Sequence, residues 1–122
     1  MTLLTGIHHV QLAMPAGNED AARAFYVGVL GLSEQPKPPV LAARGGAWFA
    51  DGTVQIHLGV EADFRPARKA HPALLVADLD AFVRACADAG ISVKSDDDLP
   101  GFRHCYVDDP FGNRLEFLQP VR

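Results

Sequence analysis

Two stretches of this chain follow the same order of apolar runs, turns and ligand-type residues. His71 follows His9 by 62 positions. Glu116 follows His57 by 59 positions. Matching spacings of this kind are typical of a duplicated structural unit. Each copy has the pattern strand, helix, strand, strand, strand (βαβββ), which is too small to enclose a core alone, so the two copies are expected to complete one fold.

The first copy covers about residues 5–60. Its strands alternate apolar and polar residues, its helix lies between an N-capping asparagine and a glycine, and prolines 36, 38 and 39 restrict one segment to the edge of a sheet. Asp51 and Gly52 form a hairpin turn. The expected elements are a strand at 7–14, a helix from Asn18 to Gly31, an edge strand or loop at 33–40, and strands at 47–50 and 54–60.

The second copy covers about residues 71–120. It follows a linker at 61–70, whose apolar residues show neither the alternation of a strand nor the spacing of a helix. Asp78 is suited to cap its helix and Gly90 to end it. A proline and a glycine within residues 109–113 predict a tight hairpin between the last two strands. The expected elements are a strand at 71–77, a helix from Asp78 to Gly90, and strands at 91–94, 103–107 and 114–119.

This pattern predicts an α+β fold in a single domain of 122 residues. The two tandem βαβββ units are expected to form a curved mixed sheet around an open metal and substrate cleft, with the helices on its outer face. The linker would allow the two halves to pair within one chain or between two chains.

Composition excludes several classes of function. The net charge is −4 and no run of lysine or arginine could follow a phosphate backbone, so we expect no nucleic-acid partner. No apolar run approaches the roughly 20 residues of a membrane-spanning helix, and the first residues lack a signal-peptide pattern. Two cysteines, Cys86 and Cys105, favour reduced thiols in a cytoplasmic protein.

Four residues that could bind a metal occupy equivalent places in the two copies. His9 and His71 are on the first strands, and His57 and Glu116 are on the last, each on the face opposite the apolar residues. Taken singly, each histidine fits a solvated residue, and a lone carboxylate on a strand is usually solvated as well. Four such side chains at matching positions instead suggest one divalent ion such as Mn, Fe, Ni, Co or Zn.

Other residues are candidates for binding a substrate. Arg65, Arg68 and Lys69 place three cations just before His71, which fits either a solvated linker or the recognition of a carboxylate or phosphate. His104, on an interior strand, could line a pocket, but a surface or supporting role fits it better. The aromatic candidates, each equally compatible with a place in the core, are Trp48, Phe49, Phe64, Phe102 and Tyr106.

Three segments resemble the signatures of the vicinal oxygen chelate superfamily: residues 7–12 (IHHVQL), 25–32 (FYVGVLGL) and 109–116 (DPFGNRLE). That superfamily includes glyoxalase I, fosfomycin-resistance thiol transferases, extradiol dioxygenases, methylmalonyl-CoA epimerases and bleomycin-binding proteins. The resemblance covers essentially the whole chain and points to the fold, whereas the activity varies among members.

The resemblance implies metal ligands at His9, His71 and Glu116, the set of two histidines and one carboxylate found in the dioxygenases and fosfomycin transferases. His57 falls where glyoxalases carry a fourth ligand, normally glutamate or glutamine. Three neutral imidazoles and one carboxylate would leave a divalent site with a formal charge of +1, which favours an anionic oxygen ligand. Glyoxalase chemistry proper is therefore less expected than that of another metal-assisted member.

The resulting expectation is a metal-dependent enzyme, glyoxalase-like, fosfomycin-resistance-like or dioxygenase-like, acting on a small oxygenated and anionic substrate chelated to the ion. Glu116 is the expected catalytic residue; the expected substrate-binding residues are Arg65, Arg68, Trp48 and Tyr106. The alternative is a metal-free binding protein for an antibiotic or another small molecule, of the bleomycin-resistance type. Relatives with one pair of units per chain are commonly homodimers, so a homodimer is expected here.

Overall fold

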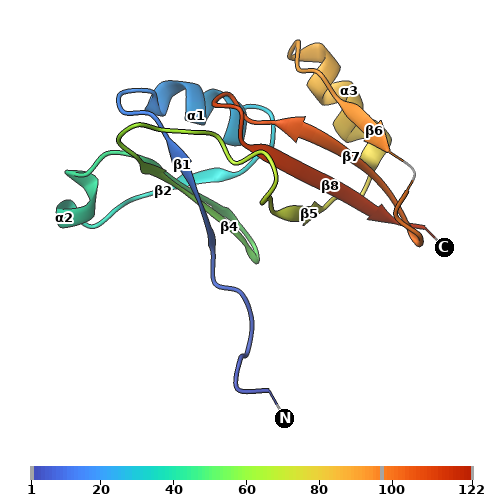
Figure 1. Ribbon diagram of the computed structural model, residues 1–122, viewed down its shortest axis with the longest axis horizontal. Helices are drawn as coiled ribbons and strands as arrows, with labels where there is room; N and C mark the ends of the chain where they lie inside the picture. Colours follow the sequence, from blue (N-terminus) through green and yellow to red (C-terminus); the bar gives the residue numbers. More distant parts are fainter. Residues whose placement is uncertain (1, 97, 122) are drawn as a thin grey trace. The chain divides into compact units, whose positions relative to one another are not determined.

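The computed structural model describes residues 2–96 and 98–121, which divide into two compact units, Met1–Arg65 and Pro66–Arg122. Each unit holds one four-stranded mixed sheet with a helix packed on one face (Figure 1). The predicted α+β fold with a repeated βαβββ unit is confirmed. No helix in the described part of the chain is long and apolar enough to cross a membrane.

The first unit contains a sheet in the order β1-β4-β3-β2, in which β1 runs parallel to β4 and the other neighbours are antiparallel. The first two strands of the unit, β1 and β2, therefore form the edges of the sheet, and the β3–β4 hairpin lies between them. In chain order the elements are β1 (Val10–Met14), α1 (Glu19–Tyr26), β2 (Ser33–Gln35), α2 (Pro39–Ala42), β3 (Ala47–Asp51) and β4 (Val54–Val60).

The first core lies between this sheet and α1. Alternate residues of the strands, among them Met14, Phe49 and Leu58, are almost fully buried, and Phe25 and Tyr26 of α1 are buried with them. The rings of Tyr26 and Phe49 stack with their centroids 5.3 Å apart. The other face of the sheet carries His57 and Trp48, so the prediction that His57 lies on the face opposite the core residues is confirmed for this unit.

Three boundaries in the first unit differ from the sequence-based expectation. Strand β1 begins at Val10 rather than at residue 7, so His9 immediately precedes it. Helix α1 ends at Tyr26, and the amides of Gly28 and Leu30 then donate to carbonyls five residues earlier in a wider turn. Gly28 suits this turn because a Cβ atom there would lie 2.3 Å from the Ala24 carbonyl oxygen. Part of the proline-rich segment forms the short helix α2, since proline is well accommodated in the first turn of a helix.

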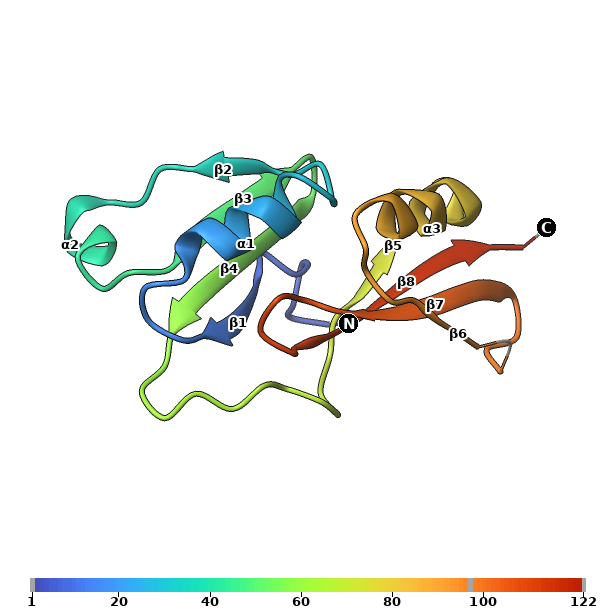
Figure 2. The same cartoon turned by 90° about the horizontal axis from the view of Figure 1, so that it is seen from above.

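The second unit repeats this arrangement with the strand order β5-β8-β7-β6, and β5 runs parallel to β8. Helix α3 lies against one face of this sheet (Figure 2). In chain order its elements are β5 (Ala73–Leu75), α3 (Leu79–Asp88), β6 (Lys94–Asp96), β7 (Phe102–Asp108) and β8 (Arg114–Pro120).

Helix α3 has the expected ends. The Asp78 carboxylate accepts a hydrogen bond from the Ala81 amide at 3.0 Å, which caps the first turn. Gly90 has a φ of +73°, the left-handed conformation that commonly ends a helix. The Ile91 amide still donates to the Cys86 carbonyl, so residue 91 belongs to the helix exit and β6 begins only at Lys94, later than expected. Strand β5 is shorter than expected because Pro72, just before it, has no N–H to donate to a neighbouring strand.

The predicted hairpin at residues 109–113 is confirmed and is held by buried hydrogen bonds. The Asp109 carboxylate accepts from the amides of Phe111 and Asn113, both at 2.9 Å, and from the Asn113 side chain at 3.0 Å. The Asn113 side-chain oxygen accepts from the Ala67 amide at 3.0 Å. Gly112 supplies the positive φ, +91°, that the turn needs. This network fixes where β8, and hence Glu116, begins.

Candidate metal and substrate site

Glu116 is the centre of a buried polar cluster in the second unit. It lies mid-strand on β8 between the core residues Leu115 and Phe117, and only 8% of its surface is exposed. One carboxylate oxygen lies 2.9 Å from His71 Nε2, and the other lies 2.8 Å from His104 Nδ1. Both oxygens of Glu116 are therefore held by imidazole rings.

The His71 ring is oriented by a backbone carbonyl. Its Nδ1 lies 2.8 Å from the Lys69 carbonyl oxygen, and because a carbonyl can only accept, Nδ1 must carry the hydrogen. In the neutral ring Nε2 then presents a lone pair to the Glu116 carboxylate. Two acceptors at 2.9 Å need a positive centre between or beside them, either a proton or a metal ion. An imidazole fixed in this way by a second hydrogen bond is typical of histidines that bind metals.

His104 is the member of this cluster that the sequence-based site did not include. It lies on β7, it is 5% exposed, and its Nδ1 contacts Glu116. Its Nε2 is buried without a hydrogen-bond partner among the described residues, and the closest carboxylate oxygen, from Asp96, is 4.0 Å away. The hairpin register pairs Tyr106 with Glu116 and so places His104 two residues away on the same face. A prediction of this hairpin register from the sequence would have indicated that His104 lies close to Glu116.

Tyr106 lies between the two histidines of the cluster. Its ring makes edge contacts with His71 and with His104, both with centroids 5.6 Å apart. Burial, and then the nearby Glu116 carboxylate, raise the pKa of the Tyr106 hydroxyl, so it stays protonated at neutral pH. A protonated phenol is able to donate a hydrogen bond.

In the first unit, His57 is sandwiched between two other rings. The His9 ring lies parallel to it with the centroids 4.0 Å apart, and the Trp48 ring stacks with a centroid distance of 4.3 Å. The sheet register explains the second contact, because Trp48 and His57 are direct partners on β3 and β4. Two of the predicted ligands and one predicted substrate-binding residue are thus adjacent in this unit.

His57 is held in its neutral form by its surroundings. Burial is the largest cause that lowers its pKa, followed by repulsion from His9, from His8 and from Lys37. A neutral imidazole keeps a lone pair for a metal, and a metal ligand must be unprotonated.

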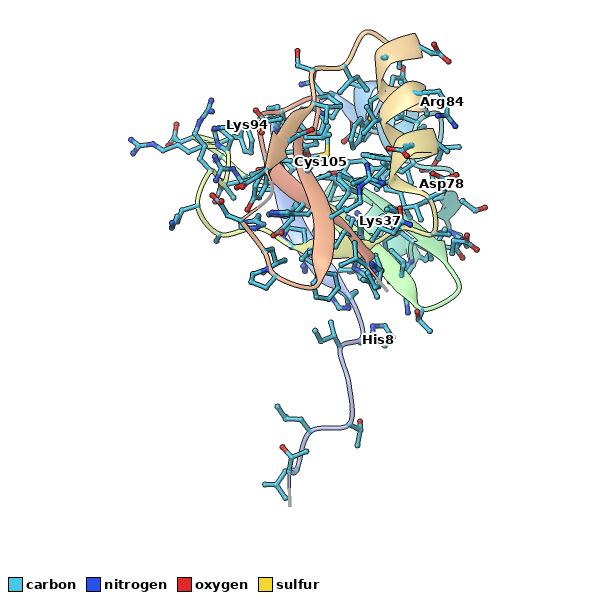
Figure 3. All side chains as sticks on the ribbon, turned by 90° about the vertical axis from the view of Figure 1, so that its right-hand side faces the viewer. His8, Lys37, Asp78, Arg84, Lys94 and Cys105 are labelled. Atoms are coloured by element: carbon cyan, nitrogen blue, oxygen red, sulfur yellow. The ribbon has the colours of Figure 1, made fainter. Side chains whose placement is uncertain are left out.

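His9 itself is exposed on the extended segment that leads into β1, where Figure 3 labels its neighbour His8. The Nδ1 atoms of His8 and His9 lie 2.9 Å apart. His8 is also exposed and lies just before the start of β1.

The cationic residues of the linker are less closely associated with these clusters. Arg65 and Arg68 are both exposed. A Cβ atom on Gly112 would lie 3.8 Å from the Arg68 guanidinium, so Arg68 lies beside the hairpin rather than beside His71 or Glu116.

The four predicted ligands thus occur as two pairs, His9 with His57 in the first unit and His71 with Glu116 in the second. Among residues 2–96 and 98–121, no group of three or more histidine, cysteine or carboxylate side chains is assembled as a metal site. The first pair supplies a neutral imidazole, and the second pair supplies an oriented imidazole and a carboxylate. Imidazole nitrogens and carboxylate oxygens are ligand types that divalent transition metals bind.

The fold defines a protein built from two βαβββ repeats, and sequence comparison assigns the family. Residues 6–117 match the Glyoxalase/Bleomycin resistance protein/Dioxygenase superfamily, and the chain belongs to this superfamily. No curated protein matches the chain significantly.

Among solved structures, a glyoxalase family protein from Bacillus anthracis is 46% identical, with 99% of each chain covered and a TM-score of 0.95. Two more distant structures share the fold. TnmS3, an antibiotic binding protein from Streptomyces sp. CB03234, is 21% identical over 99% of this chain and all of its own, with a TM-score of 0.76. The fosfomycin resistance protein FosX from Listeria monocytogenes is 15% identical over 98% of this chain and 96% of its own, also with a TM-score of 0.76.

Proposed function

We propose that this protein is a metal-dependent enzyme that acts on a small oxygenated, anionic substrate. The ion would be held by His9, His57, His71 and Glu116. The observation that carries the proposal is the arrangement of the second pair, in which the Lys69 carbonyl orients His71 so that Nε2 and a Glu116 oxygen meet at 2.9 Å. A divalent ion satisfies both of these acceptors at once.

When bound, the ion would polarise substrate oxygens and stabilise negative charge that develops on them. Glu116 is the carboxylate of the set and the proposed catalytic residue, able to receive a proton from the substrate. His104 is proposed as a positioning residue, because its Nδ1–H would hold the other Glu116 oxygen and leave one oxygen directed at the ion. Tyr106 would donate a hydrogen bond to a substrate oxygen. Arg65 and Arg68 remain candidates for a substrate anion.

The metal test compares single variants of the four ligands after metal loading and gel filtration. Parent protein is expected to retain about one divalent ion per four-ligand set, measured by elemental analysis. The variants His71→Ala and Glu116→Ala should lose most of the bound metal, because the remaining ligands cannot complete the shell. His57→Ala should lose less, because it keeps His9, His71 and Glu116, the set of two histidines and one carboxylate that suffices in related enzymes. Full occupancy in both of the first two variants would contradict the assignment.

A metal-free binding protein is the second candidate. The ring stack of His57 with Trp48 and the fold shared with the antibiotic binding protein TnmS3 favour it. The His71–Glu116–His104 cluster could also be satisfied by protons alone. The same elemental analysis separates the two, since parent protein of this second kind would retain no divalent ion after gel filtration.

The thiols Cys86 and Cys105 are free and buried, which supports the proposed cytoplasmic location.

A further inference from the structure

We propose that a cationic cleft in the first unit binds an oxyanion, carboxylate or phosphate, that is attached to a flat ring. This inference rests on the proposed function in one respect: the ligand would be the anionic end of the enzyme's substrate. The residues that form the cleft are different from the four proposed metal ligands.

The cleft has a volume of about 270 Å³ and opens on the sheet face that carries His57. Its polar and aromatic lining comes from three elements that are distant in sequence: β1, the segment around α2, and the β3–β4 hairpin. The residues that define it are Gln11, Lys37, Leu41, Arg44, Trp48 and Gly59. A volume of this size accommodates a small molecule rather than a large drug-like one.

Two cations give the cleft its charge. Lys37 is partly buried, and its ammonium donates one hydrogen bond to the Gly45 carbonyl, which leaves two of its three hydrogens for a ligand. Arg44 is exposed. Within the described residues neither cation forms an ion pair with a carboxylate. Two cations that form no ion pair in the described part of the chain lie at one cleft, and the nearby Glu19 carboxylate accepts from the Gly46 amide instead. In a chain whose net charge is −4, this favours an anionic ligand.

The aromatic part of the ligand is indicated by Trp48. This residue lines the cleft and also stacks on His57, so it joins the cationic end to the first pair of proposed metal ligands. The Lys37 ammonium lies 5.9 Å from the centre of the Trp48 ring. One face of the Trp48 ring is covered by His57. A flat ring carrying an oxyanion would therefore lie against the remaining exposed part of Trp48 and place its charge beside Lys37 and Arg44.

Two glycines, Gly46 and Gly59, allow close approaches of the chain at the cleft. A Cβ atom on Gly46 would lie 2.1 Å from the Leu58 carbonyl oxygen, so only glycine allows the segment after Arg44 to approach β4 so closely. The Gly46 amide also donates to the Glu19 carboxylate at 2.9 Å, which fixes this segment. On the floor of the cleft, a Cβ atom on Gly59 would lie 2.8 Å from the Gln11 amide nitrogen. Gly59 therefore leaves room for the Gln11 side chain, which can donate to the same anion.

The test uses Trp48, the single tryptophan of the chain, as a fluorescent reporter. Chelator-treated protein is titrated with phenyl phosphate, with benzoate, and with phenol as the uncharged match. The variants are Lys37→Gln and Arg44→Gln. Arg84→Gln is the control. Arg84 is an exposed arginine on α3, labelled in Figure 3, so this variant removes the same charge from a residue that does not line the cleft. Circular dichroism shows whether each variant is folded.

Phenyl phosphate or benzoate is expected to change Trp48 emission saturably, and the stronger of the two identifies the preferred anion. Each cleft variant should weaken that binding about fivefold or more, as for the loss of one charge-assisted contact, and added salt should weaken it further. The control should bind like the parent. The inference is overturned if neither anion binds the parent, if phenol binds as tightly as the anions, or if both cleft variants bind like the parent.

Because the titration contains no metal, its outcome is separate from that of the metal test. Anion binding by a protein that retains no divalent ion would leave this inference standing while the proposed enzyme failed. If the protein retains a divalent ion but binds neither anion, the proposed enzyme stands and this inference fails.

Discussion

Glu116 shows how much one side chain can depend on its neighbours. Its two oxygens are each within 2.9 Å of an imidazole nitrogen, although the residue lies on a strand between two core residues. A buried carboxylate is stable only when it is paired or hydrogen-bonded. The role proposed for His104 follows from this requirement and can be measured.

Replacing His104 should weaken metal binding without removing a ligand. In His104→Leu one Glu116 oxygen loses its donor, and the metal affinity is expected to fall by about tenfold or more. His104→Asn should retain much of the affinity, because the asparagine amide can donate from near the position of Nδ1. Competition with a chromophoric chelator measures both affinities. Equal affinities in parent, leucine and asparagine variants would show that His104 does not position Glu116.

The buried thiols should make stability fall at alkaline pH. Burial raises the pKa of Cys105 from 9.0 to about 11. Between these two values the unfolded chain releases a proton that the folded chain keeps, so the free energy of unfolding decreases as pH rises from about 9 to about 11. The loss from this group is at most about 3 kcal/mol, at about 1.4 kcal/mol for each pKa unit. Cys105→Ala, although less stable at neutral pH, should show a smaller decrease in urea denaturation over this range, and an unchanged slope would contradict the assignment.

At the scale of elements, the β7–β8 hairpin positions the carboxylate cluster. The turn at residues 109–113 sets the register that pairs Tyr106 with Glu116 and Cys105 with Phe117. Asn113, which is 1% exposed, links this turn to the Ala67 amide. Local sequence chemistry in the turn therefore determines which side chains meet at Glu116.

The variant Asn113→Ala should be strongly destabilised. It removes the hydrogen bonds that the largely buried Asn113 side chain makes with the Ala67 amide and with one oxygen of Asp109, at a cost of about 2 to 4 kcal/mol. Urea denaturation followed by circular dichroism measures the change. The exposed variant Asn18→Ala is the control. The Asn18 side chain donates to the nearby Ala16 carbonyl and, contrary to the expectation from the sequence, does not cap α1 in the described part of the chain. A loss in Asn113→Ala no larger than in this control would contradict the structural role of the turn.

At the scale of the whole molecule, we predict a homodimer. The segment before β1 exposes large apolar side chains: Leu3 is 93% exposed, Leu4 79% and Ile7 83%. Apolar side chains that are so fully exposed in one segment are favourable positions for a contact with a second copy. Light scattering at micromolar concentration should give twice the mass of the chain. The double variant Leu3→Ser, Leu4→Ser should weaken the dimer, whereas a monomeric mass for the parent would contradict the prediction.

Much of the fold could be predicted from the sequence because its signals are local. Alternation placed Met14 and Leu58 on the core face and His57 on the other, and the turn residues placed the hairpin at 109–113, all as the structure shows. Proline patterns were less informative. They excluded an internal strand at residues 33–40 but did not reveal α2, because the same residue type fits both an edge segment and a first helical turn.

The sequence by itself determined the duplicated βαβββ unit, the two faces of each strand and the four ligand-type residues, because each of these depends on spacing along the chain. Only the tertiary structure decided which side chains meet. The contact of His104 with Glu116, the stacking of Trp48 on His57 and the gathering of Lys37 and Arg44 at one cleft each join residues from different strands or loops. Such encounters depend on strand register and on close backbone approaches, which are set by packing over the whole unit and not by neighbouring residues.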